Sequence, residues 1–259
     1  MNKELSVAIT SAKKGGKVLM KYFRKKFIVE EKNDGTPVTI ADKKSEEVII
    51  KNIKKTFPFH AFWGEESGEH GRSEYVWIID PLDGTKSFAR GLRDFGISIA
   101  LQKKGDIVLG VVYLPATNEL YTAEKGKGAF KGGKRIFSSK IDTLDKSMVY
   151  LDTNRKKWEA DDLWDKGSSL MKKTEIIRSE NGTNKLMYVA EGIAEAYVGL
   201  GLEPWDVAAA GLIIKEAGGT LTDFSGKETI LLNRCISSNG RVQKEILNIL
   251  GGKNNNVEN

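Results

Sequence analysis

The stretch that most constrains this chain runs from Trp77 to Phe88 and joins an apolar run to a polar turn. Its apolar start, with Val76 before it, predicts a strand that is covered on both faces and ends at Asp80. A proline follows, and Gly84 permits a left-handed backbone, so we expect the chain to turn there. Asp80 and Asp83 can then converge on one point, which is tolerable only with a cation or a proton between the two carboxylates. A turn with two solvated aspartates is the structural alternative.

Length and composition predict an ordinary globular protein. The 259 residues are 40% hydrophobic and 29% charged, and no run approaches the roughly 20 apolar residues that a membrane span needs. The N-terminus lacks the apolar segment of a secretory signal. A single cysteine, Cys235, cannot form an intrachain disulfide, which fits a reducing cytoplasm. We therefore expect a cytoplasmic protein that does not enter a membrane.

The charge balance favours small anionic partners over nucleic acid. The chain has 41 Lys and Arg against 35 Asp and Glu, a net charge of +6, and such a surface attracts anions. Many of the cations share the first helix, namely Lys13, Lys14, Lys17, Lys21, Arg24, Lys25 and Lys26. No aromatic residues alternate with them, so we interpret them as a solvated helix face rather than a nucleic-acid site. Attraction of a small phosphorylated metabolite is compatible with this charge.

Hydrophobic periodicity predicts two halves of different character. In the first, about 1–145, we expect helices over 4–24 and after residue 42, strands at 28–30, 76–80, 95–102, 107–114 and 119–122, and a hairpin around 126–133. In the second, about 146–250, strands at 147–151, 175–178, 194–199 and 220–223 alternate with helices at 161–172, 184–191, 205–218 and 241–250. No linker separates the halves, so we predict one α/β domain of the α+β kind over 1–250, followed by a disordered tail at 251–259.

Three further acids lie where the chain changes direction. Asp42 occupies an N-cap position before a helix, Glu65 lies between glycines in a break within a strand, and Asp206 begins an apolar helix. Each has a structural explanation, because aspartates cap helices and paired glutamates are common in loops. However, the small residues after Asp206 imply a tightly packed helix with a rigid N-terminus, which suits a metal ligand.

Four stretches together resemble the inositol monophosphatase family of metal-dependent, lithium-inhibited phosphatases. They are Trp77-Ile-Ile-Asp-Pro-Leu-Asp-Gly-Thr85, Trp205-Asp-Val-Ala with Glu216-Ala-Gly-Gly219, Gly64-Glu-Glu-Ser67, and Pro37-Val-Thr-Ile-Ala-Asp42. They occur in the family's order, and the likeness spans about residues 5–250. The resemblance implies a layered αβαβα sandwich of the inositol monophosphatase and fructose-1,6-bisphosphatase type, with the site where the two halves meet. It also implies a homodimer.

The resemblance further implies a centre of two or three Mg²⁺ ions. The implied ligands are Glu65, Asp80 and the backbone carbonyl of Leu82 for the first ion, and Asp80, Asp83 and Asp206 for the second. These hard oxygen ligands suit Mg²⁺ rather than zinc, and His60 and His70 match no ligand motif.

The resemblance also assigns the chemistry. Thr85 is expected to pair with Asp42, with Glu65 assisting, to orient and activate the water that attacks the phosphate. The backbone donors of Gly84 and Thr85 are expected to receive the phosphate at a helix start. No covalent phosphoenzyme is implied.

Substrate identity is where the motifs diverge. Lys86-Ser87-Phe88 looks like the histidinol-phosphate or nucleotide-phosphate members. Gly182-Thr183-Asn184-Lys185, before an apolar helix, is similar to 3′-phosphoadenosine 5′-phosphate phosphatases. By contrast, residues 199–206 and 94–101 look like bacterial inositol monophosphatases. Glu203 either binds substrate hydroxyls or an amine, or is a solvated loop residue.

We therefore rank inositol-1-phosphate first, and expect Lys86, Asn184 and Glu203 to contact the substrate. Histidinol phosphate and 3′-phosphoadenosine 5′-phosphate follow, then fructose-1,6-bisphosphate. A non-catalytic regulatory or nucleic-acid-binding protein on the same fold is the alternative of a different class, and the complete set of acids argues against it.

Overall fold

The structure is a computed structural model that describes residues 2–25, 29–31, 37–152, 163–180 and 182–251. The expected beginnings of a strand at residue 28 and of a helix at residue 161 lie outside the described residues, as does the expected tail beyond Gly251. The α-helices are α1 (Lys3–Tyr22), α2 (Ile40–Lys54), α3 (Thr85–Ala89), α5 (Trp164–Lys173), α6 (Thr183–Ala190), α7 (Pro204–Glu216) and α8 (Gln243–Leu250). None of these helices combines the length and apolar composition that a membrane crossing requires.

An eight-stranded sheet forms most of the first half of the chain. Its strands, in spatial order, are β10 (Lys134–Ile136), β9 (Gly128–Lys131), β8 (Glu119–Glu124), β7 (Asp106–Leu114), β6 (Gly96–Lys103), β5 (Tyr75–Asp83), β3 (Ala61–Gly64) and β4 (Gly68–His70). Neighbouring strands are antiparallel except β3 and β5, which are parallel. Because parallel strands end at the same edge of a sheet, the residues that follow β3 lie beside Asp80 in β5.

A five-stranded sheet belongs to the second half. Its order is β12 (Ile176–Ser179), β11 (Met148–Leu151), β13 (Ala196–Leu200), β15 (Arg234–Ser238) and β14 (Thr220–Thr222). Cys235 is buried in β15, as the apolar sequence around it predicted. A separate two-stranded ribbon, β1 (Val29–Glu31) and β2 (Pro37–Thr39), precedes α2.

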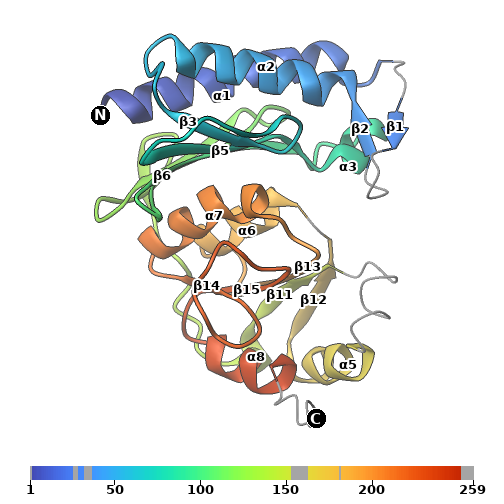
Figure 1. Cartoon of the computed structure of the whole chain (residues 1–259). Coiled ribbons are helices and arrows are strands. Elements are labelled where there is room, and N and C mark those ends of the chain that lie inside the picture. Colours follow the sequence, from blue (N-terminus) through green and yellow to red (C-terminus); the bar gives the residue numbers. More distant parts are fainter. Residues whose placement is uncertain (1, 26–28, 32–36, 153–162, 181, 252–259) are drawn as a thin grey trace, which may run out of the picture.

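Figure 1 shows how these elements stack in five layers. The pair α1 and α2 covers the outer face of the eight-stranded sheet, α6 and α7 lie between the two sheets, and α5 and α8 cover the five-stranded sheet from the other side. This arrangement confirms the αβαβα sandwich. The central helix α7 is apolar on nearly all sides because it contacts strands of both sheets. Its position explains why Asp206, near its start, lies between the two halves.

The strand was expected to end at Asp80, and this was wrong. Strand β5 continues to Asp83 and stays paired with β6, with Asp80 opposite Ser98 and Asp83 opposite Gly96. Two residues of β5 therefore face one residue of β6, which is a β-bulge. The bulge accommodates the missing donor of the proline without ending the strand. The chain turns at Gly84, as expected, and the φ of +90° at this residue is a left-handed conformation that glycine adopts without strain.

Candidate metal centre

Three aspartates from two parts of the fold converge at the junction of the two halves. Asp80 and Asp83 come from the end of β5, and Asp206 comes from the first turn of α7. Each offers a carboxylate oxygen, and these oxygens lie within 4.8 Å of one another. Asp80 is 1% exposed, while Asp83 and Asp206 are half-buried. Asp80 and Asp83 therefore converge as expected, and Asp206, more than 120 residues further along the chain, joins them.

The β-bulge explains how Asp80 and Asp83 reach the same point. In a regular strand, residues three apart point to opposite faces. The extra residue of the bulge shifts this alternation by one, so both side chains lie on one side. The bulge is also fixed locally, because the backbone N–H of Leu82 donates to Asp80 Oδ1 at 2.8 Å. The Leu82 side chain is buried, and its carbonyl accepts from the Thr85 hydroxyl at 3.1 Å.

Glu65 joins this group from the neighbouring strand end. It follows β3 directly, and its backbone N–H donates to the carbonyl of Ile79 at 3.1 Å. Its carboxyl lies close enough to Asp80 for its charge and a hydrogen bond to raise the pKa of Asp80. Parallel pairing of β3 with β5 therefore places Glu65 and Asp80 side by side at one sheet edge.

The carboxylates raise one another's pKa. Burial, followed by the charges of Glu65, Asp83 and Asp206, raises the pKa of Asp80 well above its usual range. Burial and the charge of Asp83 do the same for Asp206. Ionised carboxylates are unfavourable in such a place unless a cation neutralises them. The oxygen-only donors fit a hard divalent ion such as Mg²⁺, whereas His60 and His70 take no part: His60 accepts a hydrogen bond from the Trp77 indole, and His70 is exposed on β4.

Asp42 and Thr85 form the pair that the resemblance implied. The single hydrogen of the Thr85 hydroxyl is shared between Asp42 Oδ1 and the Leu82 carbonyl, each at 3.1 Å. Asp42 is fully buried, and its other carboxylate oxygen accepts from the backbone N–H and hydroxyl of Thr39 at 2.9 and 2.5 Å. Burial raises the pKa of Asp42, and the hydrogen bonds from Thr39 and Thr85 oppose this.

The expected helix cap at Asp42 was wrong. Thr39 is the N-cap of α2, and Asp42 lies three residues further on, in a reciprocal capping box. The same arrangement occurs in α7, where Glu203 is the N-cap and its backbone N–H donates to Asp206 Oδ2 at 2.8 Å. Asp42 and Asp206 therefore each stabilise the start of a helix with one carboxylate oxygen. The other oxygen stays available for a second contact, so each residue can have both a capping role and a functional role.

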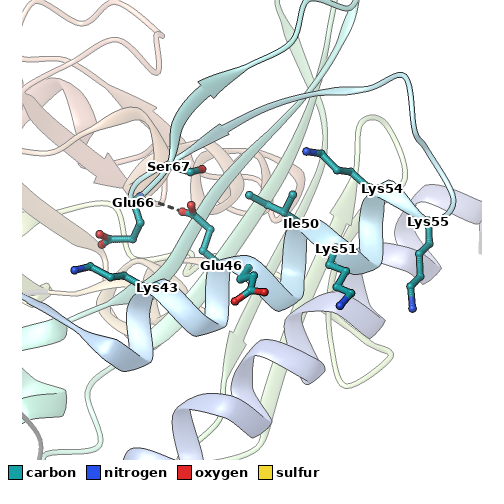
Figure 2. A pocket seen from close by; sticks show the side chains of 9 residues that line it. Lys43, Glu46, Ile50, Lys51, Lys54, Lys55, Glu66 and Ser67 are labelled. Atoms are coloured by element: carbon teal, nitrogen blue, oxygen red, sulfur yellow. Dashed lines mark hydrogen bonds between the residues drawn. The ribbon is translucent and has the colours of Figure 1, made fainter.

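Glu46 was missed by the sequence interpretation, although it holds the turn that carries Glu65. It is 2% exposed on α2, and its Oε2 accepts from the backbone N–H of Glu66 at 3.0 Å (Figure 2). A Cβ on Gly64 would lie 2.6 Å from Glu46 Oε2, so only glycine allows this approach. The signal was available: Glu46 is four residues after Asp42, on the same face of α2.

A surface cavity of about 700 Å³ borders this turn at Glu66 and Ser67. Its lining is Lys43, Glu46, Glu47, Ile50, Lys51, Lys54, Lys55, Glu66 and Ser67. Figure 2 shows Glu46 reaching toward Glu66, while the lysines of the last turn of α2 extend outward. The cavity thus borders the turn of Glu65 without containing any of the three clustered aspartates.

The residues that were expected to contact the substrate differ in burial and in their contacts. Gly84 is the N-cap of α3, next to Thr85. Lys86 and Glu203 are exposed. Asn184 is 7% exposed, and its amide donates to Asp94 Oδ1 at 2.8 Å. Thr183, Lys185 and Asp94 lie in stretches that resemble family members, but the sequence assigned them no role, because their contact partners are distant in the sequence.

Comparison with known proteins agrees with the fold. Residues 1–252 match the model of the inositol monophosphatase family. The chain is 36% identical over 254 residues to the Nus factor SuhB of Salmonella typhimurium, with 95% of each chain covered. It is 37% identical over 262 residues to the histidinol-phosphatase of Chlorobaculum parvum, covering 97% of this chain and 98% of that protein. The solved IMPase of Thermotoga maritima superposes with a TM-score of 0.88 at 34% identity, covering 96% and 97% of the two chains. The chain therefore belongs to the inositol monophosphatase family.

Proposed function

We propose that this protein is a Mg²⁺-dependent phosphoric monoester hydrolase whose first candidate substrate is inositol-1-phosphate. The observation that carries the proposal is the convergence of Asp80, Asp83 and Asp206 within 4.8 Å at the junction of the two halves. Family membership, together with a relative named as a phosphatase, supports the reaction class. The oxygen donors support the choice of metal.

The ligands that we propose are Glu65, Asp80, Asp83, Asp206 and the carbonyl of Leu82, which would hold two or three Mg²⁺ ions. When bound, Mg²⁺ neutralises the charge of a phosphate dianion and makes a coordinated water more acidic. The residues of this chain bind and orient. Because the Thr85 hydroxyl donates to Asp42, its lone pairs can accept a hydrogen bond from the attacking water. The backbone donors of Gly84 and Thr85 would face the phosphate at the start of α3.

Histidinol phosphate is the second candidate, and two observations favour it. The relative from Chlorobaculum parvum is named histidinol-phosphatase, and Lys86-Ser87-Phe88 follows the motif in this chain. The acids Asp94 and Glu203 near the site would suit a leaving group that carries an amine. 3′-Phosphoadenosine 5′-phosphate and fructose-1,6-bisphosphate follow. A regulatory protein without catalytic activity is the alternative to a hydrolase, because several relatives are named Nus factor SuhB.

A phosphate-release panel tests the reaction and ranks the substrates. We expect inositol-1-phosphate to give the highest kcat/KM among inositol-1-phosphate, histidinol phosphate, 3′-phosphoadenosine 5′-phosphate and fructose-1,6-bisphosphate. Release is expected to need millimolar Mg²⁺, to stop with a chelator and to fall with added Li⁺. If no monoester releases phosphate under these conditions, the hydrolase proposal is abandoned. Salt-sensitive binding to duplex DNA or RNA would then favour the regulatory alternative.

Glu46 offers a test of how the Glu65 turn is held. Glu46→Ala removes the acceptor of the Glu66 N–H, so we expect it to lower the free energy of unfolding by about 1–3 kcal/mol. It should also lower kcat at least about tenfold, because small displacements of a catalytic group reduce the rate steeply. Glu46→Gln keeps an acceptor and should retain most activity.

Glu47→Ala is the matched control for Glu46, because Glu47 is exposed on the same helix. It should leave both the thermal midpoint and phosphate release close to wild type. Equal effects of the substitutions at Glu46 and Glu47 would show that the buried contact with Glu66 does not hold the turn.

The homodimer and the cytoplasmic location remain proposals. The first follows from the family resemblance, and the second from the single buried cysteine. Sedimentation equilibrium of the purified protein would measure the oligomeric state directly.

A further inference from the structure

Three consecutive residues at the start of α6 reach across to the first half of the chain. Both the backbone N–H and the hydroxyl of Thr183 donate to Asp83 Oδ2. The next two residues contact one partner, since the Asn184 amide and the Lys185 ammonium lie 2.8 and 3.0 Å from Asp94 Oδ1. Asp83 and Asp94 flank α3. The first turn of α6 is therefore tied to the segment that carries the metal-binding motif.

We propose that Thr183 is a positioning residue that orients Asp83 for the metal. This inference rests on the proposed Mg²⁺ chemistry, and it adds a residue to which the sequence assigned no role. Two donors on a single oxygen of Asp83 restrict rotation of the carboxylate, and so fix the direction of Oδ1. A ligand held in one orientation loses less entropy when the metal binds. Removal of a partner that supports a metal ligand typically weakens metal binding by about 10–100-fold.

The contacts of Lys185 hold Thr183 in position. The Lys185 side chain is 3% exposed, pairs with Asp94 and Glu180, and lies 5.6 and 5.3 Å from the ring centroids of Tyr150 and Tyr188. A buried ammonium that is paired in this way anchors the first turn of α6 against the loop before β6. Thr183, two residues earlier in the same helix, is thereby held against Asp83.

The test compares two substitutions that differ by a hydroxyl. Mg²⁺ is titrated calorimetrically into metal-free Thr183→Val and Thr183→Ser. Valine has the shape of threonine without the hydroxyl, so we expect Thr183→Val to raise the Kd for Mg²⁺ about tenfold. Thr183→Ser keeps the donor and should stay within about threefold of wild type. Circular dichroism confirms folding, and Thr183→Ala is used by the same criteria if the valine variant does not fold.

A control and three outcomes separate this inference from the proposed function. Thr174→Val also removes a threonine hydrogen bond, to the Leu170 carbonyl at 2.8 Å, and should not change Mg²⁺ binding. If Thr183→Val binds Mg²⁺ as tightly as wild type, the inference is overturned and the proposed function stands. If Thr183→Ser is as weak as Thr183→Val, the hydroxyl is not the cause, and the inference fails as well. If wild type binds no Mg²⁺, both are overturned.

Discussion

Asp83→Asn is expected to remove nearly all phosphate release while the fold stays intact. The amide keeps the shape of the side chain but loses the charge that a divalent cation requires. Metal ions supply several kcal/mol of charge stabilisation in the transition state, so we expect kcat to fall at least about a hundredfold. The amide oxygen can still accept the two hydrogen bonds that Thr183 donates to Asp83. A fully active Asp83→Asn would contradict the metal assignment.

Stability measurements separate this loss from unfolding. Because Asp83 contributes to the charge that raises the pKa of Asp80 and of Asp206, neutralising it relieves repulsion in the metal-free protein. In the presence of a chelator, we therefore expect the thermal midpoint of Asp83→Asn to equal or exceed that of wild type. The matched control is Asp106→Asn, at an exposed aspartate paired with Lys125, which should leave activity unchanged.

Thr85→Val is expected to have the second largest effect, and to act on chemistry more than on metal binding. It removes the hydroxyl that donates to Asp42 at 3.1 Å and that we propose orients the attacking water. General acid–base and orienting groups contribute about 10²–10⁴-fold to rates, so a loss of kcat in this range is expected. The affinity for Mg²⁺ in a calorimetric titration should fall less than kcat, because Thr85 is not itself a proposed ligand and its hydroxyl contacts only the Leu82 carbonyl among them.

Thr85→Ser is the companion variant, because it keeps the hydroxyl beside Asp42. We expect it to retain kcat within about tenfold of wild type. If Thr85→Val and Thr85→Ser lose kcat equally, the methyl group rather than the hydroxyl matters, and the water-orienting role is withdrawn. If Thr85→Val keeps the wild-type kcat, the pair with Asp42 has only a structural role.

The sequence predicted the order of elements and the layered fold well. Local periodicity identified the alternation of strands and helices after residue 147, and the apolar, small-residue sequence of α7 indicated a tightly packed helix. The motifs supplied the acids that converge, because each lies at a strand end or a helix start. Asp80, Asp83 and Asp206 could therefore be named before any tertiary contact was known.

The β-bulge at Asp80 could not be predicted from the sequence in the same way. A proline beside two aspartates indicates a turn when only local propensity is considered. Whether the strand continues depends on pairing with β6, and this pairing keeps Asp83 in register with Gly96. Tertiary pairing overrode the local preference. The bulge, rather than a turn, therefore places the side chains of Asp80 and Asp83 on the same side of β5.

Supporting residues were missed because their partners are far away in the sequence. Thr183 donates to Asp83 across 100 residues, and Lys185 reaches Asp94 across 91. A threonine or lysine at a helix start has no local feature that indicates such a partner. Glu46 differs, since helical spacing from Asp42 places it on the buried face. The ligands were thus predictable from motifs, whereas the residues that hold them required the structure.

The clustered aspartates are an unfavourable feature of the metal-free fold. Partly and fully buried carboxylates raise one another's pKa at a point where hydrophobic packing would have served stability better. Such a local conflict with folding rules is expected at functional sites. The repulsion between the aspartates is offset by the cation that we propose they hold, so binding of Mg²⁺ should raise the thermal midpoint of wild type.

The most direct test of this metal centre is a crystal structure of the protein soaked with Mn²⁺, with anomalous scattering measured near the manganese edge. We expect at least one anomalous peak within coordination distance of Asp80, Asp83 and Asp206, and its loss or weakening in crystals of Asp83→Asn. Absence of any peak at these three aspartates in well-ordered wild-type crystals, or a peak only elsewhere on the molecule, would contradict the account.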